Sequence, residues 1–169
     1  MNIRPLGNPD AGAYQALRLL ALAEQPAAFA SSHAEEAGRS VEQIRGFLCG
    51  SADRVVLGAF DGETLIGVVG IGREGSLKLR HKAFIRSMYV ASSYRRQGIG
   101  QRLIAEALAI ARAWVDVAQI TLVVTDGNSE ALQLYQQAGF KEYGREPRAL
   151  LVDGRHYDDI LMWRGTDAH

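Results

Sequence analysis

The chain has 169 residues, 47% of them hydrophobic and 22% charged, and its 19 basic side chains balance 19 acidic ones. This size and composition are typical of a globular protein with one hydrophobic core, so we expect a single domain over residues 1–169. The even charge balance argues against nucleic-acid or membrane-surface partners, and the lack of a signal-like N-terminus or a long apolar run predicts a cytoplasmic protein.

The first residues predict a strand followed by a helix. Residues 1–4 are compatible with a short strand. Asn8 and Pro9 are a helix-start signal, because asparagine caps helix N-termini and proline is favoured at the first helical position. Apolar residues at helical spacing follow, so we expect a helix over residues 11–22.

The next segment predicts a loop and a second helix. Helical periodicity stops after the first helix, and residues 24–38 are predicted to form a long polar loop. Ser40 with Gln43 three residues later is typical of a capping box, which predicts a short helix that ends near residue 48.

The middle of the chain predicts a hairpin and a central strand. Residues 55–60 and 65–71 are rich in β-branched side chains and flank Asp61-Gly62, which is a strong hairpin signal. Residues 84–90 combine aromatic and β-branched side chains and are predicted to form the strand around which the sheet is organised.

The last third predicts a strand, a helix and a terminal hairpin. Residues 120–125 form a continuous β-branched run, which is typical of a strand buried on both faces. A helix over residues 129–138 is ended by Gly139, and strands near 148–152 and 157–163 complete the chain. The order of elements predicts an α/β fold with a mixed, partly antiparallel central sheet flanked by helices.

A glycine-punctuated turn joins the central strand to the next helix and has the features of a phosphate cradle. The turn is Arg95-Arg96-Gln97-Gly98-Ile99-Gly100. Helix N-termini present unpaired N–H groups and partial positive charge, glycines let an anion approach the backbone, and arginines add donors. A dinucleotide-binding G-x-G-x-x-G pattern fails because its third glycine would be Leu103, and the P-loop pattern does not occur.

A second motif follows in the segment 122–140, LVVTDGNSEALQLYQQAGF. This buried strand, asparagine and A-x-x-L-Y-x-x-x-G-F pattern resembles the C-terminal motif of the GNAT superfamily of N-acetyltransferases, and R-x-x-G-x-G resembles its pyrophosphate loop. The matching residues of the second motif are Asn128, Ala131, Leu134, Tyr135, Gly139 and Phe140. The resemblance covers residues 55–163 and implies two central strands that splay apart around acetyl-CoA.

The resemblance also implies roles for individual residues. The backbone of the central strand would pair with the pantetheine amides, the N–H groups of the turn would hold the pyrophosphate, and Asn128 would bond the pantetheine arm. Tyr135 would sit beside the thioester sulfur. The implied cofactor-binding residues are Met88, Tyr89, Val90, Arg95, Arg96, Gln97, Gly98, Ile99, Gly100, Gln101, Asn128 and Tyr135.

Transfer of an acetyl group to an amine requires a proton acceptor and a proton donor. The ammonium, with a pKa of about 10, must lose a proton before it attacks, and the departing thiolate can take one from a phenol, which is the role implied for Tyr135. Some members of the superfamily carry a base glutamate at the position of Val123. The remaining base candidates are His81, Glu142, His156, Asp158 and Asp159, with His156 and Asp158 favoured by their place on the terminal hairpin.

We therefore expect an N-acetyltransferase that moves the acetyl group of acetyl-CoA directly to a primary amine of a small molecule, such as an amino acid, polyamine-like compound or antibiotic. The only cysteine, Cys49, lies away from both motifs. The alternatives are a protein N-terminal or lysine acetyltransferase and a non-catalytic acyl-CoA-binding regulator. Glu35 and Glu36 lie in the predicted loop, either to attract a cationic amine or as plain exposed residues. No metal is expected, and a homodimer is compatible with the sequence.

Overall fold

The computed structural model describes residues 1–166, which form a seven-stranded sheet and five α-helices. The strands are β1 (Asn2–Pro5), β2 (Arg54–Asp61), β3 (Thr64–Arg73), β4 (Lys82–Val90), β5 (Gln119–Thr125), β6 (Lys141–Val152) and β7 (Arg155–Gly165). The α-helices are α1 (Ala11–Glu24), α2 (His33–Ala37), α3 (Val41–Leu48), α4 (Ile99–Ala113) and α5 (Ser129–Gln137). Short 3₁₀ turns include η1 (Asn8–Asp10), η2 (Pro26–Ala28), η3 (Leu77–Leu79) and η4 (Ser92–Tyr94).

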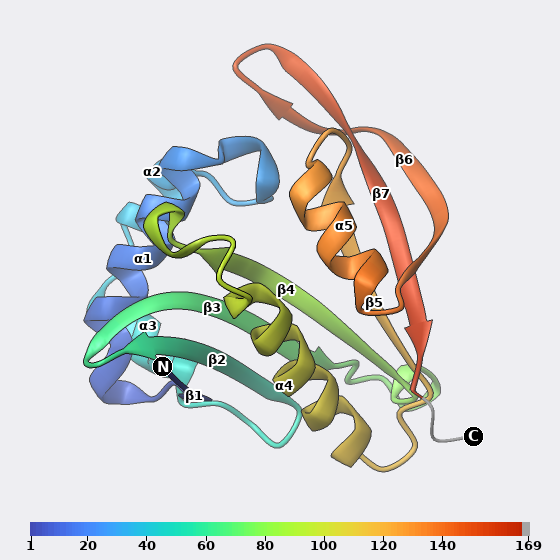
Figure 1. Cartoon of the computed structure of the whole chain (residues 1–169), viewed down its shortest axis with the longest axis horizontal. Helices are drawn as coiled ribbons and strands as arrows, with labels where there is room; N and C mark the ends of the chain where they lie inside the picture. The colour runs from blue at the N-terminus through green and yellow to red at the C-terminus, as the bar shows by residue number, and fades with distance from the viewer. Residues whose placement is uncertain (167–169) are drawn as a thin grey trace.

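The sheet has the order β1-β2-β3-β4-β5-β7-β6, and every neighbouring pair is antiparallel except β4 and β5. Helices α4 and α5 pack on one face, whereas α1 and α3 pack on the other face over β2 and β3 (Figure 1). The mixed, partly antiparallel α/β sheet flanked by helices is therefore confirmed.

The parallel strands β4 and β5 separate soon after they meet. Their register pairs Lys82 with Gln119, Ala83 with Ile120 and Phe84 with Thr121, and it extends no further within the described residues. Figure 1 shows the two strands close together near the C-terminus of the chain and diverging toward α2 and α5. The predicted splay of the two central strands is thus present.

Most elements lie where the sequence predicts them. The Asn8-Pro9 signal opens η1 and then α1, the Ser40–Gln43 capping box precedes α3, and α4 begins directly after Gly98. The hairpin β2–β3, the strand β4 and the helix α5 agree with the predicted ranges to within a few residues.

The prediction of a continuous polar loop over residues 24–38 is wrong. This segment contains η2 and α2, and α2 begins at a capping box in which Ser32 and Glu35 bond each other's backbone. The missed signal was S-x-x-E itself, which precedes too short an apolar run to suggest a helix. Glu36 neither faces a substrate nor lies exposed, because it pairs with Arg18 of α1 and both side chains are 8% exposed.

The prediction that β5 is buried on both faces is also wrong. Leu122 and Val124 pack in the core beneath α4 and α5, but the Val123 side chain on the opposite face is 55% exposed. The exposure follows from the fold: α1 and α3 cover β2 and β3 on that face, and β4 has already diverged from β5 at this level.

The first strand of the terminal hairpin begins at Lys141, earlier than predicted. Two register shifts interrupt its alternation, one between Glu142 and Gly144 and one between Glu146 and Leu150. Pro147 lies in the second irregularity, next to Arg148 at φ 53°, and proline is tolerated in strands at such bulges. Because of these bulges, the sequence of β6 lacks the regular alternation of polar and apolar residues from which the whole strand could have been predicted.

Among residues 1–166, no helix has the length and apolar character needed to cross a membrane.

We expect Glu36→Ala to destabilise the protein by about 3 kcal/mol, because it leaves the Arg18 guanidinium buried without a counter-charge. Hydrogen exchange should accelerate most in α2. The matched control is Glu42→Ala, which removes one half of an exposed ion pair with Arg45 and should cost less than about 1 kcal/mol. Urea unfolding measures both effects, and equal losses in the two variants would contradict a structural role for the buried pair.

Candidate active site

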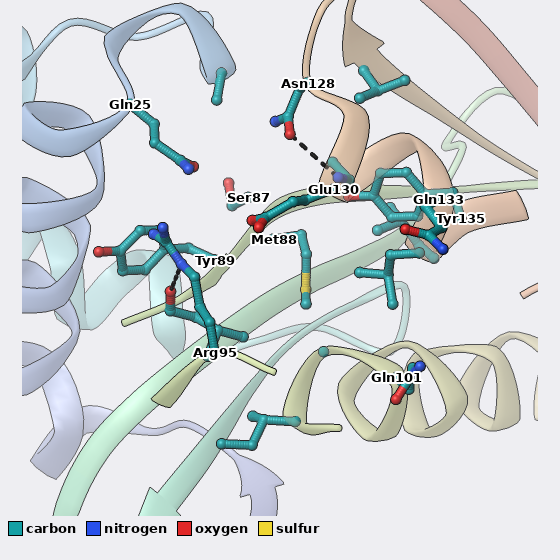
Figure 2. Close-up of a pocket in the computed structure, with 18 of the residues that line it drawn as sticks. Gln25, Ser87, Met88, Tyr89, Arg95, Gln101, Asn128, Glu130, Gln133 and Tyr135 are labelled. Atoms are coloured by element: carbon teal, nitrogen blue, oxygen red, sulfur yellow. Dashed lines mark hydrogen bonds between the residues drawn. The ribbon is translucent and has the colours of Figure 1, made fainter. Parts of the chain in front are cut away.

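The divergence of β4 and β5 opens a cavity of about 420 Å³. Its walls are β4, the turn before α4 with the first residues of α4, the C-terminal half of β5, helix α5 and the segment after α1. Figure 2 shows Gln25 from the α1–α2 segment, Met88 from β4, and Asn128 and Glu130 from the start of α5 around one space. Every residue implied as cofactor-binding by the sequence lines this cavity except Gln97.

The turn before α4 places unpaired backbone donors at the cavity. Arg96 and Gly98 adopt left-handed conformations, with φ of 61° and 75°. The first intrahelical bond is donated by the Arg102 N–H to the Gly98 carbonyl, so the preceding N–H groups have no partner within the helix. A Cβ atom at Gly100 would lie 3.2 Å from Met88 Cε and 3.3 Å from a Leu134 methyl group, so a side chain there would crowd these two residues of the cavity lining.

The Arg95 side chain is turned away from the turn and toward α1. Its Nε donates to the Val90 carbonyl at 2.9 Å, and its Nη2 lies 3.2 Å from Glu24. The Tyr89 hydroxyl donates to the same carboxylate at 2.6 Å. Burial, together with this bond to Glu24, raises the pKa of Tyr89 to about 12. The cluster ties the end of α1 to the end of β4.

The other polar residues of the turn lie at its rim. The exposed Arg96 guanidinium is 3.7 Å from Glu130 of α5, which spans the mouth of the cavity. Gln101 donates to Gln137 at 3.2 Å and thereby also links α4 to α5. The Gln97 amide instead reaches back to the Ser93 carbonyl, 3.5 Å away, outside the lining.

The backbone of β4 kinks where it faces the cavity. The register with β3 shifts between Gly70, which pairs with Arg86, and Val68, which pairs with Tyr89. Ser87 lies in this bulge at φ 56°, an uncommon conformation for a residue other than glycine. The bulge re-aims residues 88–90, whose edge toward β5 is unpaired in the described structure.

Asn128 and Tyr135 project from α5 into the cavity. The Asn128 side-chain oxygen accepts the Ala131 N–H at 3.2 Å and caps the helix, which leaves its amide donors for other partners. Tyr135 is 6% exposed, and its ring packs edge-on against Phe140 at a centroid distance of 6.0 Å. Burial raises the pKa of Tyr135, so its hydroxyl stays protonated at neutral pH.

Side-chain alternation divides the cavity into two halves. Ile85 and Met88 of β4 and Leu122 and Val124 of β5 face the core beneath α4 and α5. Arg86, Val123 and Thr125 face the opposite side of the sheet. The residues that line this second half are Gln25, Ala28, Phe29, Arg86, Val123 and Thr125.

The candidate bases differ in their surroundings. Asp158 accepts the Arg148 N–H at 2.8 Å and holds the β6 bulge, while His156 is exposed near the hairpin turn. Asp159 differs because its carboxylate contacts Thr125, which lines the cavity, and its Oδ1 is buried without a hydrogen-bond partner among the described residues. Burial raises the pKa of Asp159, and Glu146 and Asp158 raise it further against the lowering effect of Thr125.

Several lining residues were not recognised from the sequence. Gln25, Ala28 and Phe29 belong to the segment predicted to be a loop, and only its place after α1 could have suggested them. Arg86 did carry a signal, because it is the single charged side chain within the otherwise uncharged run from Ala83 to Val90. Glu24 does not line the cavity but accepts hydrogen bonds from Tyr89 and Arg95, and it carried no signal because the sequence predicted it as part of a polar loop.

Within residues 1–166, His, Cys, Asp and Glu side chains do not gather in groups that could hold a metal ion.

Comparison with known proteins identifies relatives of the chain. The sequence profile of the Acetyltransferase (GNAT) family matches residues 15–140. N-alpha-acetyltransferase RimI of Mycobacterium tuberculosis is 37% identical over 101 residues, which cover 58% of this chain and 59% of that protein. The match thus spans less than two thirds of that relative.

Solved structures of similar shape match almost the whole chain. The ribosomal-protein-alanine N-acetyltransferase of Brucella melitensis has a TM-score of 0.83 and 26% identity, covering 98% of this chain and 99% of that one. The yncA protein of Salmonella typhimurium, solved with its cofactor acetyl-CoA, has a TM-score of 0.87 at 19% identity, covering 100% and 95%.

We expect Asp159→Asn to stabilise the protein more at pH 8 than at pH 4. A folded-state pKa above the unfolded value of about 3.9 means that the folded protein binds more protons in this window. The contribution of Asp159 to the free energy of unfolding is therefore fully present below pH 4 and is lost as the pH rises through the folded-state pKa. Asparagine does not ionise, so the variant does not lose this contribution at high pH.

Urea unfolding at both pH values measures the difference, with Asp153→Asn on the hairpin turn as a control for removing one negative charge. A stability difference between Asp159→Asn and the parent that does not change with pH would rule out the unfavourable burial of this carboxylate.

Proposed function

The chain belongs to the GNAT family of acetyl-CoA-dependent N-acetyltransferases, and on that premise we propose that it acetylates the primary amine of a small molecule by direct transfer. The observation that carries the proposal is the cavity between β4 and β5, which is bordered by helix N–H groups without intrahelical partners, by the buried phenol of Tyr135 and by a second half on the opposite face of the sheet. We propose that this second half binds the acceptor and call it the acceptor half; its lining residues are Gln25, Ala28, Phe29, Arg86, Val123 and Thr125. We further propose that residues 1–169 act as one domain.

The residues present fit acetyl-CoA. The unpaired N–H groups at the start of α4, next to the left-handed Arg96 and Gly98, suit a pyrophosphate. The unpaired edge of β4 suits the amides of pantetheine, in the way an added strand pairs with a sheet edge. Asn128 retains amide donors toward the same arm. Bound acetyl-CoA supplies an activated acetyl thioester.

Tyr135 is the proposed proton donor. Burial keeps its hydroxyl protonated, and within residues 1–166 no side chain or carbonyl engages that hydroxyl in a hydrogen bond. A phenol so held can donate to the sulfur as the thiolate departs. Packing against Phe140 fixes the ring, so the hydroxyl is positioned without help from solvent.

The acceptor half favours a small molecule over a peptide. The Thr125 hydroxyl donates to the Ala27 carbonyl at 2.6 Å, and η2 packs against both β5 and β6. Figure 1 shows the segment between α1 and α2 reaching toward α5 and the terminal hairpin. We propose that this bridge obstructs the path of an extended peptide along this side of the sheet and admits a compact amine.

A protein N-terminus is the second candidate acceptor, favoured by the 37% identity to RimI over 101 residues. Such an acceptor would require the bond between Thr125 and Ala27 to open. The two candidates therefore differ in an observable way, because a peptide acceptor should accelerate hydrogen exchange in η2 and a small amine should not.

Release of free thiol from acetyl-CoA across a panel of amino acids, polyamines, aminated antibiotics and short peptides tests the proposal. We expect turnover with small amines and little with peptides; the reverse order would overturn the acceptor class.

Gly98→Val should abolish acetyl-CoA binding in calorimetry. Gly154→Val provides the control, since it strains a glycine at nearly the same φ, 76°, on the distant hairpin turn.

Tyr135→Phe removes only the hydroxyl and keeps the ring. We expect turnover to fall by about 10²–10⁴-fold, the usual contribution of a positioned general acid, while acetyl-CoA affinity changes by less than about tenfold. Tyr143→Phe, on the exposed part of β6, controls for loss of a phenol and should leave turnover unchanged. Full activity of the Tyr135 variant would reduce this residue to a packing role.

A further inference from the structure

The cavity contains one cation that no described group neutralises. Three arginines line it: Arg86, Arg95 and Arg96. Arg95 contacts Glu24, and Arg96 lies 3.7 Å from Glu130. Arg86 has no ion pair or hydrogen bond from its side chain to any residue in the described part of the chain.

The Arg86 side chain is exposed, and one contact restrains it. Its guanidinium carbon lies 4.2 Å from the centroid of the Phe84 ring, two residues earlier on the same strand. A cation over an aromatic face is attracted by the ring and loses part of its freedom, but its N–H donors stay available at the edge. The ring contact therefore orients the guanidinium of Arg86 while its N–H groups make no hydrogen bond within the described residues.

Strand alternation places Arg86 in the acceptor half. Ile85, its neighbour on β4, is buried in the core beneath α4, so Arg86 projects from the other face. Val123 of β5 lies on that face too, and both residues line the cavity. The turn before α4, which we propose holds the pyrophosphate, and Tyr135 lie on the face of the sheet that α4 and α5 cover. Arg86 is thus separated by the sheet from the part of the cavity assigned to the phosphates.

The acceptor half has no carboxylate to balance Arg86. The other lining residues there are Gln25, Ala28, Phe29, Val123 and Thr125, all uncharged. The nearby carboxylate of Asp159 contacts Thr125 from β7, so β5 lies between it and β4. An acceptor with only positive charges would meet uncompensated repulsion at Arg86, whereas an oxyanion would form charge-assisted bonds with it.

We propose that Arg86 binds an oxyanion of the acceptor, so that the substrate is an amine carrying a carboxylate or a similar acid, as amino acids do, and not a polyamine. This inference rests on the proposed acetyltransferase function and narrows its substrate class. Arg86 acts as a specificity residue: it holds the acidic end of the acceptor on the face opposite the cofactor, and the amine end points through the gap between β4 and β5 toward the thioester.

Matched pairs of acceptors test the proposal. For L-leucine, L-phenylalanine and L-aspartate, kcat/KM is compared with that of the corresponding α-carboxamide, alongside spermidine. We expect the parent protein to prefer the carboxylates and Arg86→Gln to reduce that preference by about 10- to 100-fold, mainly through KM, as loss of a charged hydrogen bond predicts. Arg86→Lys should restore part of it. Acetyl-CoA affinity should stay within about twofold in both variants, because the proposed pyrophosphate site is the turn before α4, away from Arg86.

Two controls separate the outcomes. Arg155→Gln removes another arginine stacked on an aromatic ring, 4.9 Å from the Tyr157 centroid, and should leave the preference unchanged. Calorimetric binding of N-acetyl-L-leucine against N-acetyl-L-leucinamide gives a readout that does not need turnover, and Arg86→Gln should abolish the difference.

Equal use of carboxylates and carboxamides by the parent, or a preference that survives in Arg86→Gln, overturns the inference and leaves the acetyltransferase proposal intact. If no amine in the panel releases thiol from acetyl-CoA, the proposed function itself fails, and the inference fails with it.

Discussion

The separation of β4 from β5 is the constraint on which the rest of the structure depends. Backbone N–H and C=O groups are costly to leave without partners, and two parallel strands that part after three paired residues expose a row of them on each facing edge. An open edge of this kind is complementary to an extended ligand that carries amide groups. If the pantetheine arm pairs with this edge, as proposed above, the position of the divergence sets where the arm lies. The turn before α4 and helix α5 border the same gap.

Contacts on both sides of the gap hold it open. The Ser87 bulge turns the end of β4 away, and Arg95 ties the Val90 carbonyl to Glu24 at the end of α1. Beyond Glu24, η2 reaches β5 through the bond between Ala27 and Thr125. Helix α1 is thus connected to both diverging strands, and the buried pair of Arg18 with Glu36 anchors α2 against it. The segment 25–29 therefore both lines the cavity and connects α1 to β5.

Much of the fold could be predicted from the sequence, because its helices and hairpins carry local signals such as Asn8-Pro9, Ser40 with Gln43, and Asp61-Gly62. The implied cofactor residues, with the exception of Gln97, line one cavity. They could be identified because the turn before α4 and the segment 122–140 carry recognisable residue patterns in the sequence. The acceptor half was not predicted. Its residues come from the segment 25–29, β4 and β5, and only the tertiary arrangement of α1 against the sheet brings this segment and Val123 to one cavity. The exposure of Val123 likewise depends on which helices cover that face.

The two halves of the cavity are lined by different residues of the same strands because side chains alternate along a strand. Successive side chains of a strand point to opposite faces, so Ile85 and Arg86, or Val124 and Val123, serve different halves of one cavity although they are neighbours in the chain. The backbone that borders the gap is common to both halves, so the proposed cofactor and acceptor sites meet there. Under the proposed assignment, a substitution at Arg86 or Val123 changes what is recognised on the acceptor side without moving the turn before α4 or Tyr135. Under the same assignment, cofactor binding and acceptor choice are physically separable because they use alternate positions on the same two strands.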